Sequence, residues 1–317
     1  MRLIRNTAIL AKIETTYGVD PSPTGSADAL LISNASFDFN YNNVDRALLR
    51  GYMGASEQLV GTRFVNLSFE VEISGSGTAG TAPAWGDLLR ACGLAETVTV
   101  GTCVEYTPIS TSLESIAIYY YDDGVVKKAL GCMGNVELGM NEGERPVFKF
   151  SFTGIDGGVS TASTPSLTLT AWKAPLVITD TNTAQVTLGG SYSAGAVTGG
   201  TAYNTRGLSL NMGNDVQTNA MLGDQSVGIT NRDATGSVQM DLTAAQEVSL
   251  MSDVNANTLT SMSMLHGTAS GAKVLVFAPA VQRINPKQAD YNGYRQIAMD
   301  LRLTPSAGND ELTIVSL

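Results

Sequence analysis

The chain has few of the residues on which most catalytic and metal-binding sites depend. Its 317 residues include one histidine, His266, and three cysteines, and only 15% of them are charged. A single histidine excludes any mechanism that needs two. Cys92, Cys103 and Cys132 are odd in number and form no C-x-x-C motif, so neither a disulfide framework nor a metal site is expected. No apolar run approaches the ~18 residues of a membrane helix, so no membrane span is predicted.

Positive charge is scarce as well. The sequence has 19 Lys and Arg residues against 29 Asp and Glu residues, a formal net charge of −10. No cluster of five or more Lys or Arg residues occurs anywhere. Proteins that hold nucleic acid tightly neutralise its phosphates with such residues, so tight DNA binding is not expected.

Motifs that carry chemistry are also missing, since no GxSxG, GxxxxGK[ST] or HExxH motif occurs. Residues 75–80 have GxGxxG spacing, but no βαβ pattern continues beyond them, and we interpret them as a flexible connection. His266, at a predicted strand end, has no designated carboxylate or nucleophile beside it. Two carboxylate pairs could serve glycoside hydrolysis or bind Ca²⁺, namely Glu70 with Glu72 and Asp122 with Asp123. We prefer the structural interpretation, in which strand alternation explains the first pair as a solvated face and turn chemistry explains the second. We therefore predict no catalytic residue, metal or cofactor and no enzyme.

What the sequence does contain is alternation of apolar and polar residues with period two, which is typical of strands with one buried face. The segments that show it are 37–41, 65–73, 135–138, 148–152, 208–212, 237–242 and 297–303. Asp123-Gly124 marks a tight hairpin turn. The pattern predicts an all-β fold.

Two short helices are predicted between these strands. Residues 83–93 begin with proline and end at glycine, and Trp85, Leu88, Leu89 and Cys92 fall on one helical face. A second helix is expected over 244–251, with Thr243 as its N-cap. Core packing explains both.

The order of elements suggests that the chain contains the same unit twice. Each half has a strand, a segment of about twenty residues, a strand, a helix and a strongly alternating closing strand. A Gly/Ser/Thr-rich stretch, 155–165, separates the halves and reads as a linker. We therefore predict two tandem β-sandwich or barrel domains, 1–154 and 166–317, with one short helix each.

The polar faces of the predicted strands are mostly acidic or uncharged, and only Lys149 and Arg302 offset the acidic residues. If several copies closed a ring, these faces would line a common bore that repels phosphates. The candidate residues for such a lumen are Asp38, Asn40, Asn66, Ser68, Glu70, Glu72, Glu137, Gln239, Asp241 and Asp300.

Segments 42–62 and 213–232 are unusually long for connections within a compact domain. They carry several apolar side chains, among them Val44, Leu48, Leu49, Tyr52, Met53, Val216, Met221 and Leu222. They either fold back on their own domain or contact a neighbouring subunit as arms. The second interpretation is preferred, because the apolar side chains would otherwise be exposed.

Four stretches of the sequence together resemble tail tube proteins of long-tailed, non-contractile bacteriophages: residues 10–18, 75–93, 147–154 and 299–305. The resemblance implies a β-sandwich with a flanking helix and a long arm that stacks one ring on the next. It also implies rings around a lumen through which the tape-measure protein and later the genome pass. Rings of the family are usually hexameric, so a duplicated chain suggests a homotrimer with six pseudo-equivalent units. Segments 42–62 and 213–232 match the family's arm by position.

The resemblance further implies a structural virion protein, made in the bacterial host cytoplasm, that acts in DNA ejection. Its expected partners are other copies of itself, the tape-measure protein, the tail terminator and distal tail proteins, and double-stranded DNA in transit. Two alternatives remain: another virion component, such as a decoration or baseplate protein, and more remotely a carbohydrate-binding β module. The second would need aromatic platforms, and Trp85 and Trp172 are the only tryptophans.

Overall fold

The computed structural model describes residues 2–317, and strands make up most of it. The all-β prediction is therefore confirmed. The first half contains nine strands and one short helix: β1 (Thr7–Ile13), β2 (Ala29–Leu30), β3 (Ser33–Val44), β4 (Leu59–Glu72), α1 (Gly86–Arg90), β5 (Leu94–Thr99), β6 (Cys103–Pro108), β7 (Ile116–Asp122), β8 (Val125–Asn141) and β9 (Val147–Thr161).

The second half contains eleven strands and a longer helix. They are β10 (Val186–Leu188), β11 (Ser191–Ser193), β12 (Ala196–Thr198), β13 (Thr201–Asn211), β14 (Asn214–Met221), β15 (Asp224–Arg232), β16 (Thr235–Asp241), α2 (Ala244–Asn255), β17 (Thr260–His266), β18 (Val274–Tyr291), β19 (Tyr294–Thr304) and β20 (Thr313–Ser316). None of the helices in residues 2–317 is long and apolar enough to cross a membrane.

The strands of the two halves pair in the same order. In the first half the antiparallel order is β1-β7-β8-β9-β4-β3, and in the second half it is β10-β17-β18-β19-β16-β13. A register shift also recurs at the same place, between Ile116 and Ile118 in β7 and between Thr260 and Met262 in β17. One difference is that β13 also pairs with β10, which closes the second half into a barrel.

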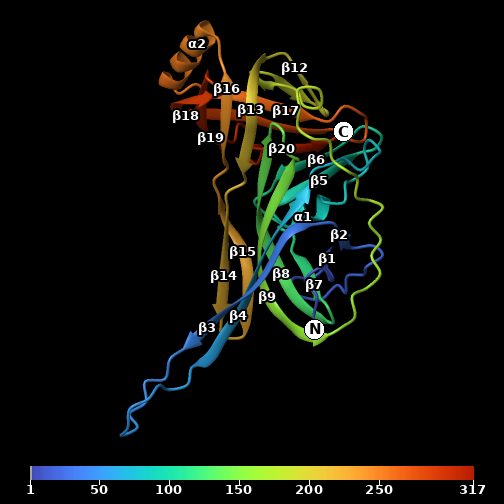
Figure 1. The fold of residues 1–317 in the computed structure, drawn as a ribbon, viewed down its shortest axis with the longest axis vertical. Helices are drawn as coiled ribbons and strands as arrows, with labels where there is room; N and C mark the ends of the chain where they lie inside the picture. Colours follow the sequence, from blue (N-terminus) through green and yellow to red (C-terminus); the bar gives the residue numbers. More distant parts are fainter. Residues whose placement is uncertain (1) are drawn as a thin grey trace.

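The halves are joined edge to edge at two places (Figure 1). The end of β8 pairs with the end of β13, from Glu137 opposite Asn211 to Asn141 opposite Gly207. The β5–β6 hairpin of the first half pairs with β20, which in turn pairs with β18. These ladders make one continuous sheet out of strands from both halves.

Alternation along the strands places apolar side chains in a common core. On β4, Val65, Leu67, Phe69 and Val71 are buried, and the polar residues between them are exposed or half-buried. Trp85 precedes α1 and packs against Phe148 with ring centroids 5.2 Å apart, while its indole N–H donates to the carbonyl of Ser74. The predicted apolar face of the first helix is therefore confirmed, although the helix covers only Gly86–Arg90.

The second helix is confirmed as well, and it begins with a capping box. The Thr243 hydroxyl accepts from the Gln246 backbone N–H, while the Gln246 side chain accepts from the Thr243 backbone N–H. Reciprocal bonds of this kind satisfy backbone donors that a helix start otherwise leaves free. The predicted Asp-Gly turn joins β7 to β8, with Asp123 and Gly124 both at positive φ.

The expected linker over 155–165 is wrong in its first part, and the second long segment has a regular secondary structure. Residues 155–161 of the expected linker continue β9 and pair with β8, from Ile155 opposite Leu130 to Thr161 opposite Val125. Residues 214–232 of the second long segment form a hairpin, β14–β15, with a register shift between Asp215 and Val216. In both cases the backbone ladder with a partner strand supplies the order, and such a ladder does not require alternating side chains.

Candidate functional site

A polar face extends over strands from both halves and is the main candidate surface. Pairing runs without a break through β3-β4-β9-β8-β13-β16-β19-β18. Directly opposed residues point to the same side of a sheet. One row of such residues crosses six strands: Glu70, Lys149, Glu137, Asn211, Thr235 and Arg302.

All ten lumen candidates lie on strands of this sheet, and all are exposed or half-buried. Asp38 lies directly opposite Asn66, and the hydroxyls of Ser36 and Ser68 are 2.9 Å apart on neighbouring strands. At the junction of the halves, the Asn211 amide donates to the Glu137 carboxylate over 3.1 Å. The structure thus places candidates from both halves on one sheet.

Arg145, between β8 and β9, partly neutralises this face, so the expectation that only Lys149 and Arg302 do so is wrong. Its guanidinium lies 3.0 Å from a Glu72 oxygen and 3.2 Å from a Glu70 oxygen, and it donates to Ser33. Glu70 also accepts from the Asn34 amide. These partners explain the first carboxylate pair without a catalytic role.

The polar face becomes apolar at one end, where the β14–β15 hairpin covers it. Phe64, Met133 and Val227 form a buried cluster. The half-buried side chains of Ile155 and Ile229 pack against it. Phe64 lies opposite Ile155, two residues before the exposed Asn66 on the same strand. The hairpin thus lies against the first half along β8 and β9 (Figure 1).

Hydrogen bonds fasten the hairpin to the first half. The Tyr17 hydroxyl accepts from the Val227 backbone N–H over 2.5 Å and donates to the carbonyl of Val227 over 3.3 Å. At the hairpin's base, the Asn214 amide donates to the carbonyls of Cys92 and Gly134. Desolvation by burial raises the pKa of Tyr17, so this hydroxyl stays neutral and can keep both roles.

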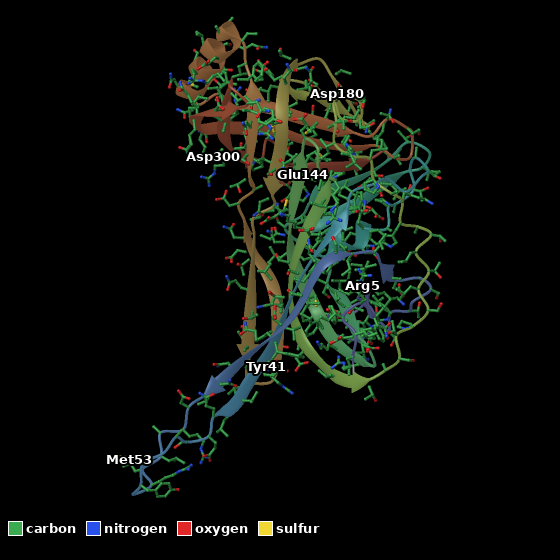
Figure 2. All side chains as sticks on the ribbon, in the orientation of Figure 1. Arg5, Tyr41, Met53, Glu144, Asp180 and Asp300 are labelled. Atoms are coloured by element: carbon green, nitrogen blue, oxygen red, sulfur yellow. The ribbon has the colours of Figure 1, made fainter. Side chains whose placement is uncertain are left out.

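The corresponding segment of the first half projects away from the rest of the chain. Figure 2 shows Tyr41 where this arm leaves the sheet and Met53 at its far end. Leu49 and Met53 are fully exposed, and Val44, Leu48 and Tyr52 are exposed as well. On the hairpin, Met221 and Leu222 are exposed at the tip, whereas Val216 packs against the first half. Exposed apolar side chains thus gather at the tips of both segments.

The contacts of the remaining candidate residues give them a structural role. His266 ends β17, is buried, and its Nδ1 lies 2.8 Å from the Thr183 hydroxyl. Asp123 accepts from the Leu3 backbone and the Asn6 amide, and so ties down the N-terminal segment. Residues 2–317 contain no cluster of three His, Cys, Asp or Glu side chains arranged for a metal ion.

The GxGxxG stretch also has a packing explanation. A Cβ on Gly75 would lie 2.1 Å from the carbonyl oxygen of Gly271, and the Gly77 backbone N–H donates to that oxygen. Glycine is needed here because two backbones approach closely. This contact also links the two halves.

Sequence reasoning missed two features of the surface. Arg145 stands outside every alternating segment, and no sequence signal connects it to Glu70 or Glu72. The apolar end of the face did have a signal, since Phe64 and Val65 are consecutive apolar residues that break the alternation. Both side chains are buried, on opposite faces of the strand.

Comparisons with known proteins identify the family of the chain. No curated protein was found to match the chain. A family model described as phage tail tube protein matches residues 4–309, which include both halves and the whole polar face. The chain therefore belongs to the phage tail tube protein family, a structural component of virion tails.

Proposed function

We propose that this protein forms rings of three chains that stack into the tail tube of a long-tailed, non-contractile phage. The observation that supports this most directly is the edge-to-edge junction of β8 and β13. It joins two units with the same strand order. Three chains linked by equivalent junctions would supply six units around an axis. Head-to-tail association through one repeated contact gives a closed ring when the rotation at each contact adds up to a full turn.

The repeated strand order also supports a duplicated domain. On this proposal each half is one tail-tube unit, with residues up to 161 in the first, because β9 extends that far. The hairpin β14–β15 and the segment 42–62 would then be the same arm in two settings. One lies against the neighbouring unit of its own chain, and the other projects from the chain.

The polar face would line the lumen. Its side chains are acidic or uncharged apart from a few bases, and two of its acidic residues are held by Arg145. A surface with an excess of carboxylates repels phosphates, so DNA would pass without being held. The tape-measure protein would occupy the same channel during assembly, and the tail terminator and distal tail proteins would bind the two ends. The chain would be made in the host cytoplasm and act in the virion.

The exposed arm tips would bind the next ring. Leu49 and Met53 on one arm and Met221 and Leu222 on the other are exposed apolar side chains on projecting segments. Burial of such side chains favours association by about 25 cal/mol per Å² of apolar surface. No catalytic step is part of the proposed role.

Electron microscopy of purified protein at high concentration tests the proposal. We expect hollow tubes, a smallest closed ring with the mass of three chains, and Glu70, Glu72 and Asp241 facing the lumen. A ring of six chains, or these carboxylates on the outer wall, would contradict it.

Substitution of the arm tip tests stacking separately from ring formation. Leu49→Asp with Met53→Asp should leave rings that no longer form tubes. Val100→Asp is the matched control, since Val100 is an exposed apolar residue in the β5–β6 turn, away from both arms. Tubes of normal length from the double variant would show that the arm does not stack rings.

A further inference from the structure

Two strand edges of the eight-strand sheet have no partner strand within residues 2–317. β3 pairs only with β4. β18 pairs with β17 as far as Val281, but from residue 282 onward it pairs only with β19. Residues 285–288 of β18 and 38–40 of β3 are exposed. A free strand edge is a ready partner for another strand.

The chain itself shows how such edges join. β8 pairs with β7 along its first part, and the edge that β7 leaves free then pairs with β13. Glu137 lies opposite Asn211 in this junction, and their side chains are hydrogen-bonded. By strand order β18 corresponds to β8, and β3 corresponds to β13. The two free edges are therefore the two sides of a second junction.

Arginines at the start of β4 and at the end of the hairpin define the register on the β3 side. Arg63 lies opposite Tyr41, and Arg232 lies opposite Asn214, where each arm meets the sheet. Three positions later in each half come the pairs Asn66 with Asp38 and Thr235 with Asn211. Asp38 therefore occupies the position of Asn211.

Counting residues from the same two arginines also defines the register on the β18 side. Seven positions after the arginines come Glu70 in the first half and Gln239 in the second. The rows that continue from them are Glu70–Lys149–Glu137 and Gln239–Ala298–Lys287. Lys287 therefore occupies the position of Glu137.

We infer that β18 of one chain pairs antiparallel with β3 of the next chain, with Lys287 directly opposite Asp38. The inference rests on the proposed function, because it assumes that the chains form a ring. Both side chains are exposed, and neither makes an ion pair or hydrogen bond within residues 2–317. Opposite charges directly across two strands stabilise the pairing, and like charges destabilise it.

A second pair of positions agrees with this register. In the junction within the chain, Gly139 lies opposite Ser209. The corresponding residues are Ala289 and Ser36, which are small and fit side by side. A slip by one residue would set the polar face of β3 beside the apolar face of β18, so a slip of this size is disfavoured. If the step between chains copies the step within the chain, every unit of the proposed ring is joined to the next by the same contact.

Cysteine cross-linking tests the register. The double variant Ser36→Cys with Ala289→Cys should give linked dimers and closed trimers when treated with a short thiol cross-linker, and nothing larger. The three native cysteines are buried and should not react. Asn40→Cys with Ala289→Cys is the matched control, since residue 40 lies on the same face about 13 Å further along the strand. The control should not cross-link.

The outcomes separate this inference from the proposed function. Tubes or rings that form without the Ser36–Ala289 cross-link, or that cross-link equally in the control, would overturn the register and leave the tube role standing. Closed cross-linked trimers that never stack would support the junction and contradict the tube.

A charge exchange provides a second test that needs no cysteine. Asp38→Lys or Lys287→Asp alone places like charges opposite each other. Each substitution should weaken the affinity of each interface between chains roughly tenfold at low salt, and so lower the fraction of chains in rings. The double exchange should restore it. Asp180→Lys and Lys173→Asp, exposed and away from both edges, should have no effect. Failure of the double exchange to restore what the single variants lose would overturn the inference.

Discussion

The attachment of the β14–β15 hairpin to the first half can be tested at Val227. This side chain is 3% exposed and packs against Phe64 and Met133. Val227→Ala removes two methyl groups, each worth about 0.8 kcal/mol of burial, and leaves a small cavity. We expect the attached state of the hairpin to be destabilised by about 2 kcal/mol relative to the detached state.

Amide hydrogen exchange is the appropriate assay, because it reports local opening separately from global unfolding. A loss of about 2 kcal/mol corresponds to roughly thirtyfold faster exchange of the hairpin amides, if the hairpin opens on its own. Tyr17→Phe should act in the same direction, since it leaves the half-buried Val227 backbone groups without partners, at a cost of about 1–3 kcal/mol. Amides of β8 and β9 should keep their protection.

Met221→Ala is the matched control, because Met221 is on the same hairpin but exposed at its tip. Its hairpin amides should exchange as in the unmodified protein. Unchanged exchange in Val227→Ala would refute the view that the buried cluster holds the hairpin. Equal acceleration throughout both halves would show instead that hairpin and sheet unfold as one unit.

Two further predictions concern charge and pH. Arg145→Gln should lower the free energy of unfolding by less than about 1 kcal/mol in urea titrations, and less at high salt, since its ion pairs with Glu70 and Glu72 are partly exposed; a loss of several kcal/mol would contradict this. Burial lowers the pKa of His266 below 6.5. The unfolded chain then binds the proton more readily, so the free energy of unfolding should fall as the pH drops below about 6.5. His266→Asn should flatten that part of the profile, and an unchanged slope would refute the assignment.

The strands that could be predicted from the sequence are those with one face in the core. Val65 to Ile73 alternate because every second side chain is buried, and this local pattern is independent of which strand lies beside it. The helix after Thr243 was predictable for the same reason, since its cap and its length are local properties. Local patterns of this kind were sufficient to predict the all-β fold class.

What the sequence could not show depends on pairing between distant segments. β10 has three residues and shows no pattern of its own, yet its pairing with β13 closes the second half into a barrel. Residues 155–161 include two adjacent glycines and show no alternation, yet they pair with β8. Arg145 lies in a turn, and its contacts with β4 exist only because β9 brings that turn beside it.

The hairpin shows the same limit for the candidate site. The sequence predicted that its apolar side chains are buried against another surface. The surface that buries Val227 belongs to the other half of the chain. No periodicity within 213–232 identifies that surface. The arm 42–62 has similar apolar content and is exposed, so a surface on a second chain is the corresponding expectation.

The two junctions of the proposed ring should therefore respond differently to salt. The junction within the chain pairs Glu137 with the neutral Asn211, and the covalent connection keeps its two edges at high effective concentration. The junction between chains must form from separate molecules, and opposite charges at Lys287 and Asp38 would favour the correct encounter. Between about 0.01 M and about 1 M salt the screening length falls from about 30 Å to about 3 Å. Ring formation followed by light scattering should weaken over this range, while exchange protection at β8 and β13 should not change. If protection at β8 and β13 fell in step with ring formation, the two junctions would be energetically alike, and the charge pair would not be what distinguishes them.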